Sequence, residues 1–317
     1  MARWLAFGFL ALFSSLAAAQ GFPDRPIRLV VPLPPGGSPD TIARALAQGL
    51  QGVWNQPVVV ENRTGGSQNI GADAVAKSPP DGYTWLIAPD NVFSVNPYLG
   101  KQPFDPLADL APVTQVARIQ FLLVVNPAVP AHSVQELIAL AKAKPGELNF
   151  GSSGNGSPQH LGATMLQVLT GTKMNHVPYK GAAPAIGDLL PGRIQVWIGA
   201  ANSLLPHVKE GKLRLLASTA PQRFASLGDV PTIGETVPGY SLDPWLGLFL
   251  PARTPNDVLM KIHGEVVKLL SAPDLKARLG PQGIELVTNS PAEFAQFIRE
   301  DNAKWGKIVK EAGIRAD

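Results

Sequence analysis

Short apolar runs alternate along this chain with segments whose apolar residues recur every three or four positions. The runs at residues 27–31, 58–61 and 84–88 have the length and composition of buried strands. Helical spacing of apolar residues starts at residue 38 and again over residues 69–76. Strands that alternate with helices in this way predict an α/β fold built on mainly parallel sheets.

The middle of the chain predicts a second set of strands and helices. Residues 113–125 form an apolar stretch that is too long for one simple strand, so we expect it to cross from one domain into another. The apolar run at 245–250 is interpreted as the return crossing. Between the crossings we expect strands at 148–150, 175–177, 195–198 and 213–218, and helices at 134–143, from 158, at 184–190 and from 203. Helices at 257–270, 274–279 and 291–312 are then expected to pack on the first domain.

The N-terminus has the composition of a secretory signal. Arg3 precedes an apolar core at residues 4–16, and three alanines at 17–19 precede Gln20. The core is shorter than the ~20 residues that a membrane-spanning helix needs. The sequence therefore predicts a signal peptide at 1–19, one domain from 20–117 plus 243–317, and a second domain at 118–242.

The absence of cysteine and the modest charge restrict what the chain can do. With no cysteine, disulfides, a lipid anchor on cysteine and thiolate metal sites are all excluded. An exported chain without cysteine is typical of a bacterial periplasm, which is the location we expect. The formal charge is +3 and no Lys/Arg cluster marks a nucleic-acid surface, so a small anionic ligand is a better match than DNA.

Two segments share one arrangement of strand, Gly-rich loop and helix start. The first ends in Gly37-Ser38-Pro39-Asp40 and the second in Gly156-Ser157-Pro158. Ser38 and Ser157 are predicted N-caps, because each serine precedes a proline that suits the first helical position. Free N–H groups and the helix dipole attract anions at such positions. Either loop alone is also explained by good capping chemistry, but the pair favours an anion site between two domains.

Enzyme motifs are absent from the sequence. It contains no Gly-x-Ser-x-Gly motif, no P-loop and no His-Glu-x-x-His spacing, so we expect no catalytic residue, metal or cofactor. His160 lies three residues into its helix and either contacts a ligand or packs on its own turn. Asp40 either favours the helix dipole or reaches the ligand through a water. Tyr179 is expected to form an aromatic wall with a hydroxyl.

The chain resembles the Bug-type extracytoplasmic solute receptors, the receptor family of the tripartite tricarboxylate transporters. The resemblance extends over nearly the whole mature chain and depends on the order and spacing of several motifs. They are Val31-Pro-Leu-Pro-Pro-Gly-Gly-Ser-Pro-Asp40, Val60-Glu-Asn-Arg-Thr-Gly-Gly66, Pro80-Asp-Gly-Tyr-Thr84, Phe150-Gly-Ser-Ser-Gly-Asn-Gly156 and His176-Val-Pro-Tyr-Lys-Gly181.

This resemblance implies a two-domain periplasmic binding protein of the type II kind, with a ligand cleft between the domains. It implies a monomer that holds a small organic carboxylate and delivers it to a membrane transporter or a sensor. The expected ligand-binding residues are Gly37, Ser38, Asp40, Asn69, Asn91, Ser152, Ser153, Asn155, Ser157, His160, Tyr179, Ala182, Asn202 and Ser203. The loop from Tyr179 to Ala182 is expected to close over the ligand.

One departure from the family bears on specificity. Where the family often carries Asp-Asn after a strand, this chain has Gly199-Ala200, followed by Asn202 and Ser203. An acid near the pocket is lost, so we expect a carboxylate ligand without an amine. The alternatives are a periplasmic hydrolase or isomerase that uses His160 with Ser152 or Ser153, and a ligand-sensing domain of a regulator, for which no DNA-binding segment is present.

Overall fold

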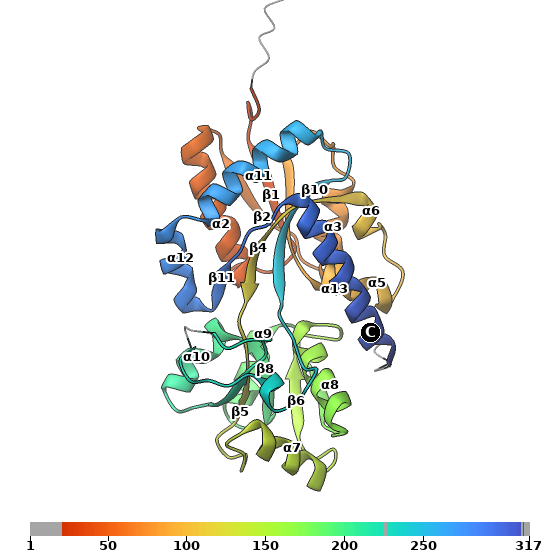
Figure 1. Ribbon diagram of the computed structural model, residues 1–317, viewed down its shortest axis with the longest axis vertical. Coiled ribbons are helices and arrows are strands. Elements are labelled where there is room, and N and C mark those ends of the chain that lie inside the picture. The colour runs from red at the N-terminus through yellow and green to blue at the C-terminus, as the bar shows by residue number, and fades with distance from the viewer. Residues whose placement is uncertain (1–20, 225–226, 312, 314–317) are drawn as a thin grey trace, which may run out of the picture.

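The computed structural model describes residues 21–224, 227–311 and 313. The predicted signal peptide at residues 1–19 lies outside the described residues. The chain forms two α/β units, each with its own sheet, and Figure 1 shows the six-stranded unit above the five-stranded one. We call them the large unit and the small unit.

The large unit is built on a mixed sheet with the strand order β11-β4-β10-β3-β1-β2. The strands are β1 (Ile27–Val31), β2 (Val58–Asn62), β3 (Thr84–Pro89), β4 (Leu110–Ile119), β10 (Trp245–Pro251) and β11 (Ile284–Leu286). Strand β1 is parallel to β2 and β3, whereas β10 is antiparallel to β3 and β4, and β11 is antiparallel to β4.

Helices cover both faces of this sheet because its strands are apolar on both sides. In β1, Leu29 and Val31 pack in one buried cluster and Val30 packs in another on the opposite face. Helices α2 (Ser38–Trp54), α11 (Asn256–Leu270) and α12 (Pro273–Leu279) contribute to the first cluster, and α3 (Asn69–Ala76) and α13 (Pro291–Glu311) to the second. The unit also has the short helices α4 (Asn91–Ser94), α5 (Asn96–Leu99) and α6 (Pro106–Asp109), and 3-10 turns at Gly66–Gln68 and Gly280–Gln282.

The small unit repeats this layered plan on a five-stranded sheet with the order β7-β6-β8-β5-β9. Its strands are β5 (Phe121–Val125), β6 (Asn149–Ser152), β7 (Asn175–Pro178), β8 (Val196–Ala200) and β9 (Arg214–Ser218). Helices α7 (Val134–Ala143) and α8 (Pro158–Thr170) cover one face, and α9 (Ala182–Leu189) and α10 (Ala201–Lys209) cover the other. A 3-10 turn at Ile233–Glu235 follows β9.

The α/β class and the two sheets agree with the sequence expectation, but the sheets are mixed and not mainly parallel. Strand β6 is parallel to β7 and β8, while β5 is antiparallel to β8 and β9. The strands that run against the rest of their sheets are β10 and β11 in the large unit and β5 in the small unit, and β5 and β10 belong to the crossing segments. A strand that leaves one sheet to enter the other cannot belong to a regular strand–helix–strand series. The periodicity of the sequence does not reveal the direction of such a strand.

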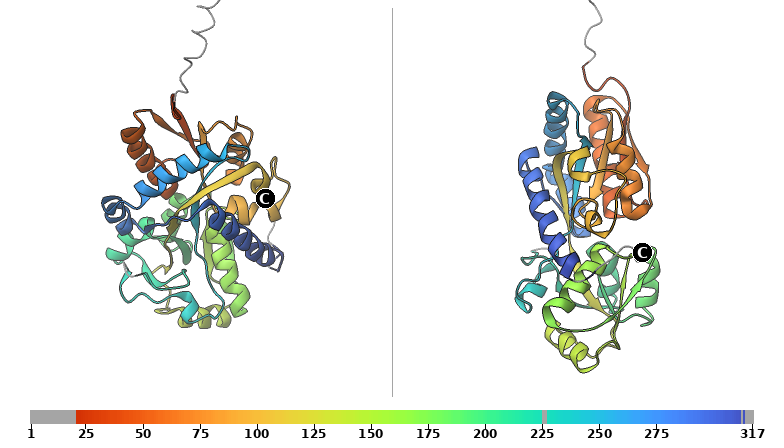
Figure 2. Two further views of the ribbon diagram at one scale, coloured as in Figure 1. Left: turned by 45° about the horizontal axis from the view of Figure 1, so that its top comes forward. Right: turned by 90° about the vertical axis from the view of Figure 1, so that its right-hand side faces the viewer.

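Two extended segments connect the units. Strand β4 ends at Ile119 in the large sheet, and β5 begins at Phe121 in the small sheet, so the long stretch is divided at Gln120. The returning chain runs beside it, because the N–H of Ile119 donates to the carbonyl of Pro244 at 2.8 Å. Figure 2 shows that the molecule narrows where the two units meet. None of the helices in the described residues is long and apolar enough to cross a membrane.

Candidate functional site

The first Gly-rich loop leads into α2, whose start differs from the prediction in one respect. Gly37, not Ser38, is the N-cap residue, and no side chain caps this helix end. Ser38 is the first helical residue, and its side chain is buried. Its hydroxyl accepts a hydrogen bond from the side-chain amide of Asn202 at 3.4 Å, so it points toward the small unit. The uncapped helix end leaves backbone donors of the first turn free for an anion.

Asp40 lies in the first turn of α2 and is held by three donors. It accepts from the N–H of Gly36 at 3.0 Å, from Arg44 at 2.9 Å and from Asn62 at 3.0 Å. Burial alone would raise the pKa of Asp40, but these hydrogen bonds outweigh it and hold the pKa below its usual value. Asp40 therefore ties the Gly36 loop to the end of β2, and the structure favours its structural role over ligand contact.

The second Gly-rich loop, residues 153–157, is fixed largely by its own hydrogen bonds. Ser157 caps α8 as predicted, and its hydroxyl also donates to the carbonyl of Gly154 at 2.7 Å. Ser152 is fully buried, donates to the same carbonyl at 3.0 Å and accepts from the N–H of Gly154 at 3.1 Å. The hydroxyl of Ser152 thus lies inside the loop with its hydrogen-bonding capacity used, which does not favour the expected contact with the ligand.

Ser153 differs from the other serines of this loop. Its side chain is half-buried, and no hydrogen bond between described residues uses its hydroxyl. Asn155 is half-buried in the same loop. Of the three serines, Ser153 thus has the hydroxyl that is available to a ligand.

Two histidines contact this loop and the residue that precedes it. The ring of His160 stacks on that of His176 with centroids 4.0 Å apart and an angle of 5° between planes. His160 Nδ1 accepts from the N–H of Gly156 at 3.1 Å, and His176 Nε2 lies 2.6 Å from Ser152 Oγ. Burial and the neighbouring His176 lower the pKa of His160 to about 4, so His160 is neutral at pH 7.

The Tyr179–Ala182 loop is arranged differently from the expectation for its tyrosine. The hydroxyl of Tyr179 donates to Asp188 at 2.9 Å, and Asp188 also pairs with Arg193 at 2.7 Å. Burial and the hydrogen bond to Asp188 raise the pKa of Tyr179 to about 12. This hydroxyl therefore serves the packing of α9 and is not available to a ligand. Gly181, with φ of 111°, is the uncapped N-cap of α9, so backbone donors near Ala182 remain as the contacts this loop offers.

Helix α10 begins two residues earlier than predicted, which places Asn202 and Ser203 in its first turn. Asn202 reaches Ser38, whereas the hydroxyl of Ser203 donates to the carbonyl of Ala200 at 2.8 Å. Ser203 thus closes its own turn, and the expectation that its hydroxyl binds the ligand is not supported.

Packing against Trp197 explains why position 199 is a glycine. A Cβ on Gly199 would overlap Nε1 of Trp197, which is fully buried on the same face of β8. Trp197 Nε1 has no hydrogen-bond partner in the described part of the chain. The large indole therefore occupies the space in which a side chain at position 199 would begin.

Asn69 and Asn91 belong to a network of amides in the large unit. Asn96 donates to Asn69 at 3.1 Å and to the carbonyl of Ser67 at 2.7 Å, and Asn91 donates to Gln68. Ser67 and Gln68 have positive φ angles of 50° and 73°. The network holds this unusual turn in place, so the two asparagines shape the loop after β2.

Two contacts bring the loops of the two units together. One is the hydrogen bond between Asn202 and Ser38. The other is at Gly156, where an added Cβ would overlap Leu99 of α5. The starts of α2 and α10 meet at the first contact, and the 153–157 loop meets α5 at the second. They follow the carboxyl ends of β1, β8 and β6, which is where open α/β sheets bind ligands.

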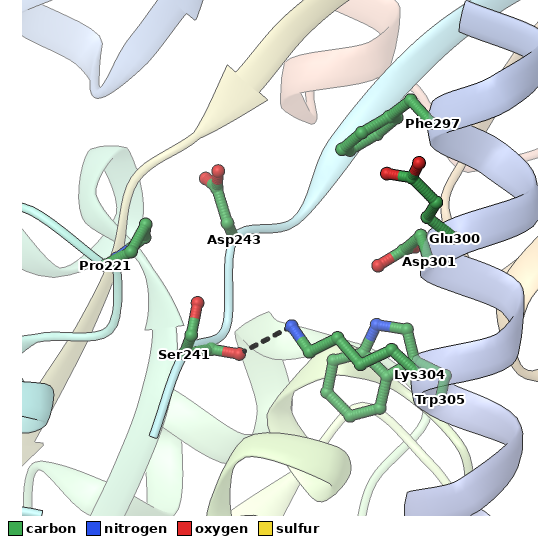
Figure 3. Close-up of a pocket in the computed structure, with 8 residues that line it drawn as sticks. All are labelled: Pro221, Ser241, Asp243, Phe297, Glu300, Asp301, Lys304 and Trp305. Carbon is green, nitrogen blue, oxygen red and sulfur yellow. Dashed lines mark hydrogen bonds between the residues drawn. The ribbon is translucent and has the colours of Figure 1, made fainter. Parts of the chain in front are cut away.

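A separate pocket of about 230 Å³ lies where α13 passes the returning crossing segment, and Figure 3 shows the side chains that line it. Lys304 extends across it, and its ammonium donates to the carbonyl of Ser241 at 3.0 Å. The lining residues are Pro221, Ser241, Asp243, Phe297, Glu300, Asp301, Lys304 and Trp305. None of them is a predicted site residue. The sequence carries no signal for this pocket, since it forms only when α13 returns to the crossing.

Two aspartates of this pocket, Asp243 and Asp301, are partly buried. Burial raises the pKa of Asp243, although Arg118 at 3.4 Å opposes the shift. Asp301 accepts from the hydroxyl of Ser94 at 2.6 Å and from the indole of Trp245 at 2.9 Å. These contacts fix α13 against β10 beside the crossing. Within the described residues, no three His, Asp or Glu side chains are placed to hold a metal ion.

Comparison with known proteins relates the whole chain to one group of receptors. The family described as "Tripartite tricarboxylate transporter family receptor" matches residues 42–314. Protein BugT of Bordetella pertussis is 36% identical over 325 residues, covering 99% of this chain and 99% of BugT. A protein of Pseudomonas sp. strain P51, from the tcbD-tcbE intergenic region, is 34% identical over 320 residues, covering 99% of this chain and 95% of its own.

Solved structures share the fold over most of the chain. An R. palustris protein solved with adipate has a TM-score of 0.87 and 35% identity, covering 93% of this chain and 100% of its own. The periplasmic binding protein BugD has a TM-score of 0.83 and 29% identity, with coverage of 93% and 100%. MatC from Rhodopseudomonas palustris with bound malate has a TM-score of 0.81 and 28% identity, with coverage of 91% and 100%. These proteins are receptors that bind solutes.

Proposed function

This chain belongs to the tripartite tricarboxylate transporter receptor family, and from that premise we propose that it binds a small organic carboxylate between its two units. The observation that carries the proposal is the junction at which Asn202 meets Ser38. The uncapped start of α2 and the hydroxyl of Ser38 lie there, and the hydroxyl of Ser153 lies in the 153–157 loop, which meets α5 of the large unit. Helix N–H groups and hydroxyls are donors that suit a carboxylate.

The matched structures support the ligand class. One contains adipate and another contains malate, and both ligands are dicarboxylates without an amine. In the present chain Gly199 offers no acid, and Trp197 fills the adjacent space. The proposed ligand is therefore a carboxylate without an ammonium group, because no acidic partner for an ammonium is offered at that position.

The proposed mechanism is capture by closure of two domains. We assign residues 20–117 and 243–317 to one domain and residues 118–242 to the other, with the crossings at Gln120 and Asp243 as the hinge. Domain closure around a ligand is a common motion of two-domain receptors. Closure would remove water from the carboxylate and strengthen each hydrogen bond to it. The closed receptor would then deliver its ligand to a membrane transporter or a sensor.

Export to the periplasm is part of this proposal. The family is a family of periplasmic receptors, and the sequence begins with the features of a signal peptide. Mass spectrometry of a periplasmic extract should find a mature chain that starts at Gln20. An intact chain recovered from the cytoplasm would contradict export.

The hydrolase alternative is excluded by the family, whose members are solute-binding receptors. The expected pair of His160 with a loop serine is also not formed. His160 accepts from the backbone of Gly156, and Ser152 is buried with its hydroxyl bonded to His176 and Gly154.

A ligand screen tests the proposed function. Purified mature protein should be melted with acetate, succinate, adipate, malate, citrate and the amino acid aspartate, because a ligand of the folded state raises the melting temperature. At least one carboxylate should raise it, and calorimetry should show succinate binding more tightly than aspartate. Preference for aspartate would overturn the ligand class, and no response to any carboxylate would overturn the function.

A further inference from the structure

The two stacked histidines behind the 153–157 loop hold it at both ends. His176 on β7 lies against Ser152, the residue that precedes the loop, with 2.6 Å between Nε2 and Oγ. His160 on α8 lies against Gly156, near the end of the loop, with 3.1 Å between its Nδ1 and the amide nitrogen. The rings are nearly parallel, 4.0 Å apart, and Phe150 of β6 stacks on His176 at 4.9 Å.

The hydrogen bond from Gly156 determines which nitrogen of the neutral His160 ring carries the proton. A backbone N–H donates to His160 Nδ1, so that nitrogen is unprotonated and the ring proton of the neutral imidazole lies on Nε2. His176 Nε2 lies 2.6 Å from Ser152 Oγ, and the donor of that hydrogen bond depends on the tautomer of His176. The two rings thus hold the loop through different nitrogens, Nδ1 of His160 and Nε2 of His176.

The neutral state of His160 is required by this arrangement. A protonated Nδ1 could not accept from Gly156, and a positive charge would lie 4.0 Å from the neighbouring ring. His176 is the titratable group whose charge acts on His160, and burial acts in the same direction. The other neighbours named above, Phe150 of β6 and the backbone of Gly156, carry no charge.

The loop that the histidines hold also meets the other unit. Gly156 has φ of 72° and is so close to Leu99 of α5 that no side chain fits there. Ser153, whose hydroxyl is unused, lies between the two held positions. A shift of either end would therefore move Ser153 relative to the start of α2.

We propose that His160 and His176 form a stacked pair that positions the 153–157 loop for ligand binding, His160 through Nδ1 and His176 through Nε2. Both are positioning residues, since they act on the ligand through the backbone and Ser152. This inference rests on the proposed carboxylate site and adds the residues that set its shape.

Matched amide substitutions test the proposal because each amide can replace one ring nitrogen. In His160→Asn the side-chain oxygen can take the position of Nδ1, and in His176→Gln the side-chain amide can take that of Nε2. These two variants should bind within about threefold of the wild type. The exchanged variants, His160→Gln and His176→Asn, and the apolar His160→Leu and His176→Leu should bind at least tenfold more weakly. The probe is whichever of adipate, succinate, malate and citrate stabilises the wild type most.

The pattern of rescue decides between the possible roles. If His160→Gln keeps the carboxylate affinity of the wild type and His160→Asn loses it, His160 contacts the ligand through Nε2 and the positioning role is wrong. Equal binding by all six variants would also overturn it. A wild type that binds none of the four carboxylates would instead be a failure of the proposed function.

Nitrogen-15 NMR of histidine-labelled protein gives a readout that does not depend on affinity or on a variant that folds. At pH 7 the ring of His160 should be the neutral tautomer with its proton on Nε2, and it should stay neutral at pH 5.5. A proton on Nδ1 of His160, or a charged ring at pH 5.5, would contradict the inference.

Discussion

The side-chain amide of Asn202 donates to the hydroxyl of Ser38 at 3.4 Å, across 164 residues of sequence and between the two units. Asn202 is in the first turn of α10, and Ser38 is the first residue of α2. A bond of this length is weak. A ligand carboxylate could therefore replace it with stronger, charge-assisted bonds to the same groups.

Removal of either group should weaken ligand binding. Ser38→Ala and Asn202→Ala should each reduce carboxylate affinity about tenfold, because a hydrogen bond to a charged group contributes about 1.5–3 kcal/mol. Calorimetry measures the change. Ser203→Ala is the matched control, since the Ser203 hydroxyl bonds to its own helix turn, and its affinity should stay close to that of the wild type. A loss in Ser203→Ala equal to that in Ser38→Ala would contradict the assignment.

Adjacent serines of the second loop should separate binding from stability. Ser153→Ala should weaken carboxylate binding about tenfold and leave the melting temperature unchanged, because no described bond uses its hydroxyl. Ser152→Ala should lower the free energy of unfolding by about 1–3 kcal/mol, because it removes a fully buried hydroxyl and leaves the part-buried N–H of Gly154 without its partner. Chemical denaturation and calorimetry on both variants check this. Reversed effects would show that the two serines have been assigned the wrong way round.

The histidine pair predicts a pH dependence of stability. The pKa of His160 is about 4 in the folded protein and near 6.5 in an unfolded chain. Between these values the unfolded chain binds more protons, so the contribution of His160 is complete above pH 6.5 and falls as the pH is lowered to 4. The difference between the two pKa values corresponds to about 3 kcal/mol.

Urea denaturation of the wild type and His160→Asn at several pH values isolates this contribution. Asp40 has a lowered pKa, so its contribution is lost only below about pH 4 and is present in both proteins. The stability of the wild type relative to the variant should therefore fall between pH 6.5 and 4. A constant difference over that range would show that His160 titrates normally.

Packing of Trp197 against Gly199 predicts a position that tolerates no side chain. Gly199→Ala should lower the free energy of unfolding by about 1–3 kcal/mol, because its Cβ must displace a fully buried indole. Gly187→Ala in α9 is the control, since nothing lies within 4 Å of its Cβ. Replacing a helical glycine with alanine should stabilise by about 0.5–1 kcal/mol. Equal effects in the two variants would mean that Trp197 moves aside easily.

Closure of the two units can be measured because the chain has no cysteine of its own. Spin labels attached to Leu107→Cys in α6 and Val168→Cys in α8 measure the distance between exposed positions on the two units. Their distance distribution should shift and narrow when the best carboxylate from the screen is added. A control pair on Leu107→Cys and Val53→Cys, both in the large unit, should not respond. An unchanged distribution for the first pair under saturating ligand would contradict ligand-driven closure.

The sequence by itself determined the class of fold and the positions at which the chain turns toward the site. Periodicity predicted β1 and α3 with the bounds that the structure has, and the predicted cap Ser157 is confirmed. These features depend on residues that are close together in the chain, so local preferences are sufficient to specify them. The family resemblance was equally accessible, since it rests on motifs in order.

Only the tertiary structure decided which polar groups are available. Ser152 and Ser153 are adjacent and chemically identical, yet one hydroxyl is buried against His176 and the other is unused. Tyr179 carries a hydroxyl at a suitable strand end, but Asp188 accepts its bond. Availability depends on partners that folding brings together from distant parts of the chain, and no local pattern records them. The same holds for Trp197, whose packing alone explains why position 199 is glycine.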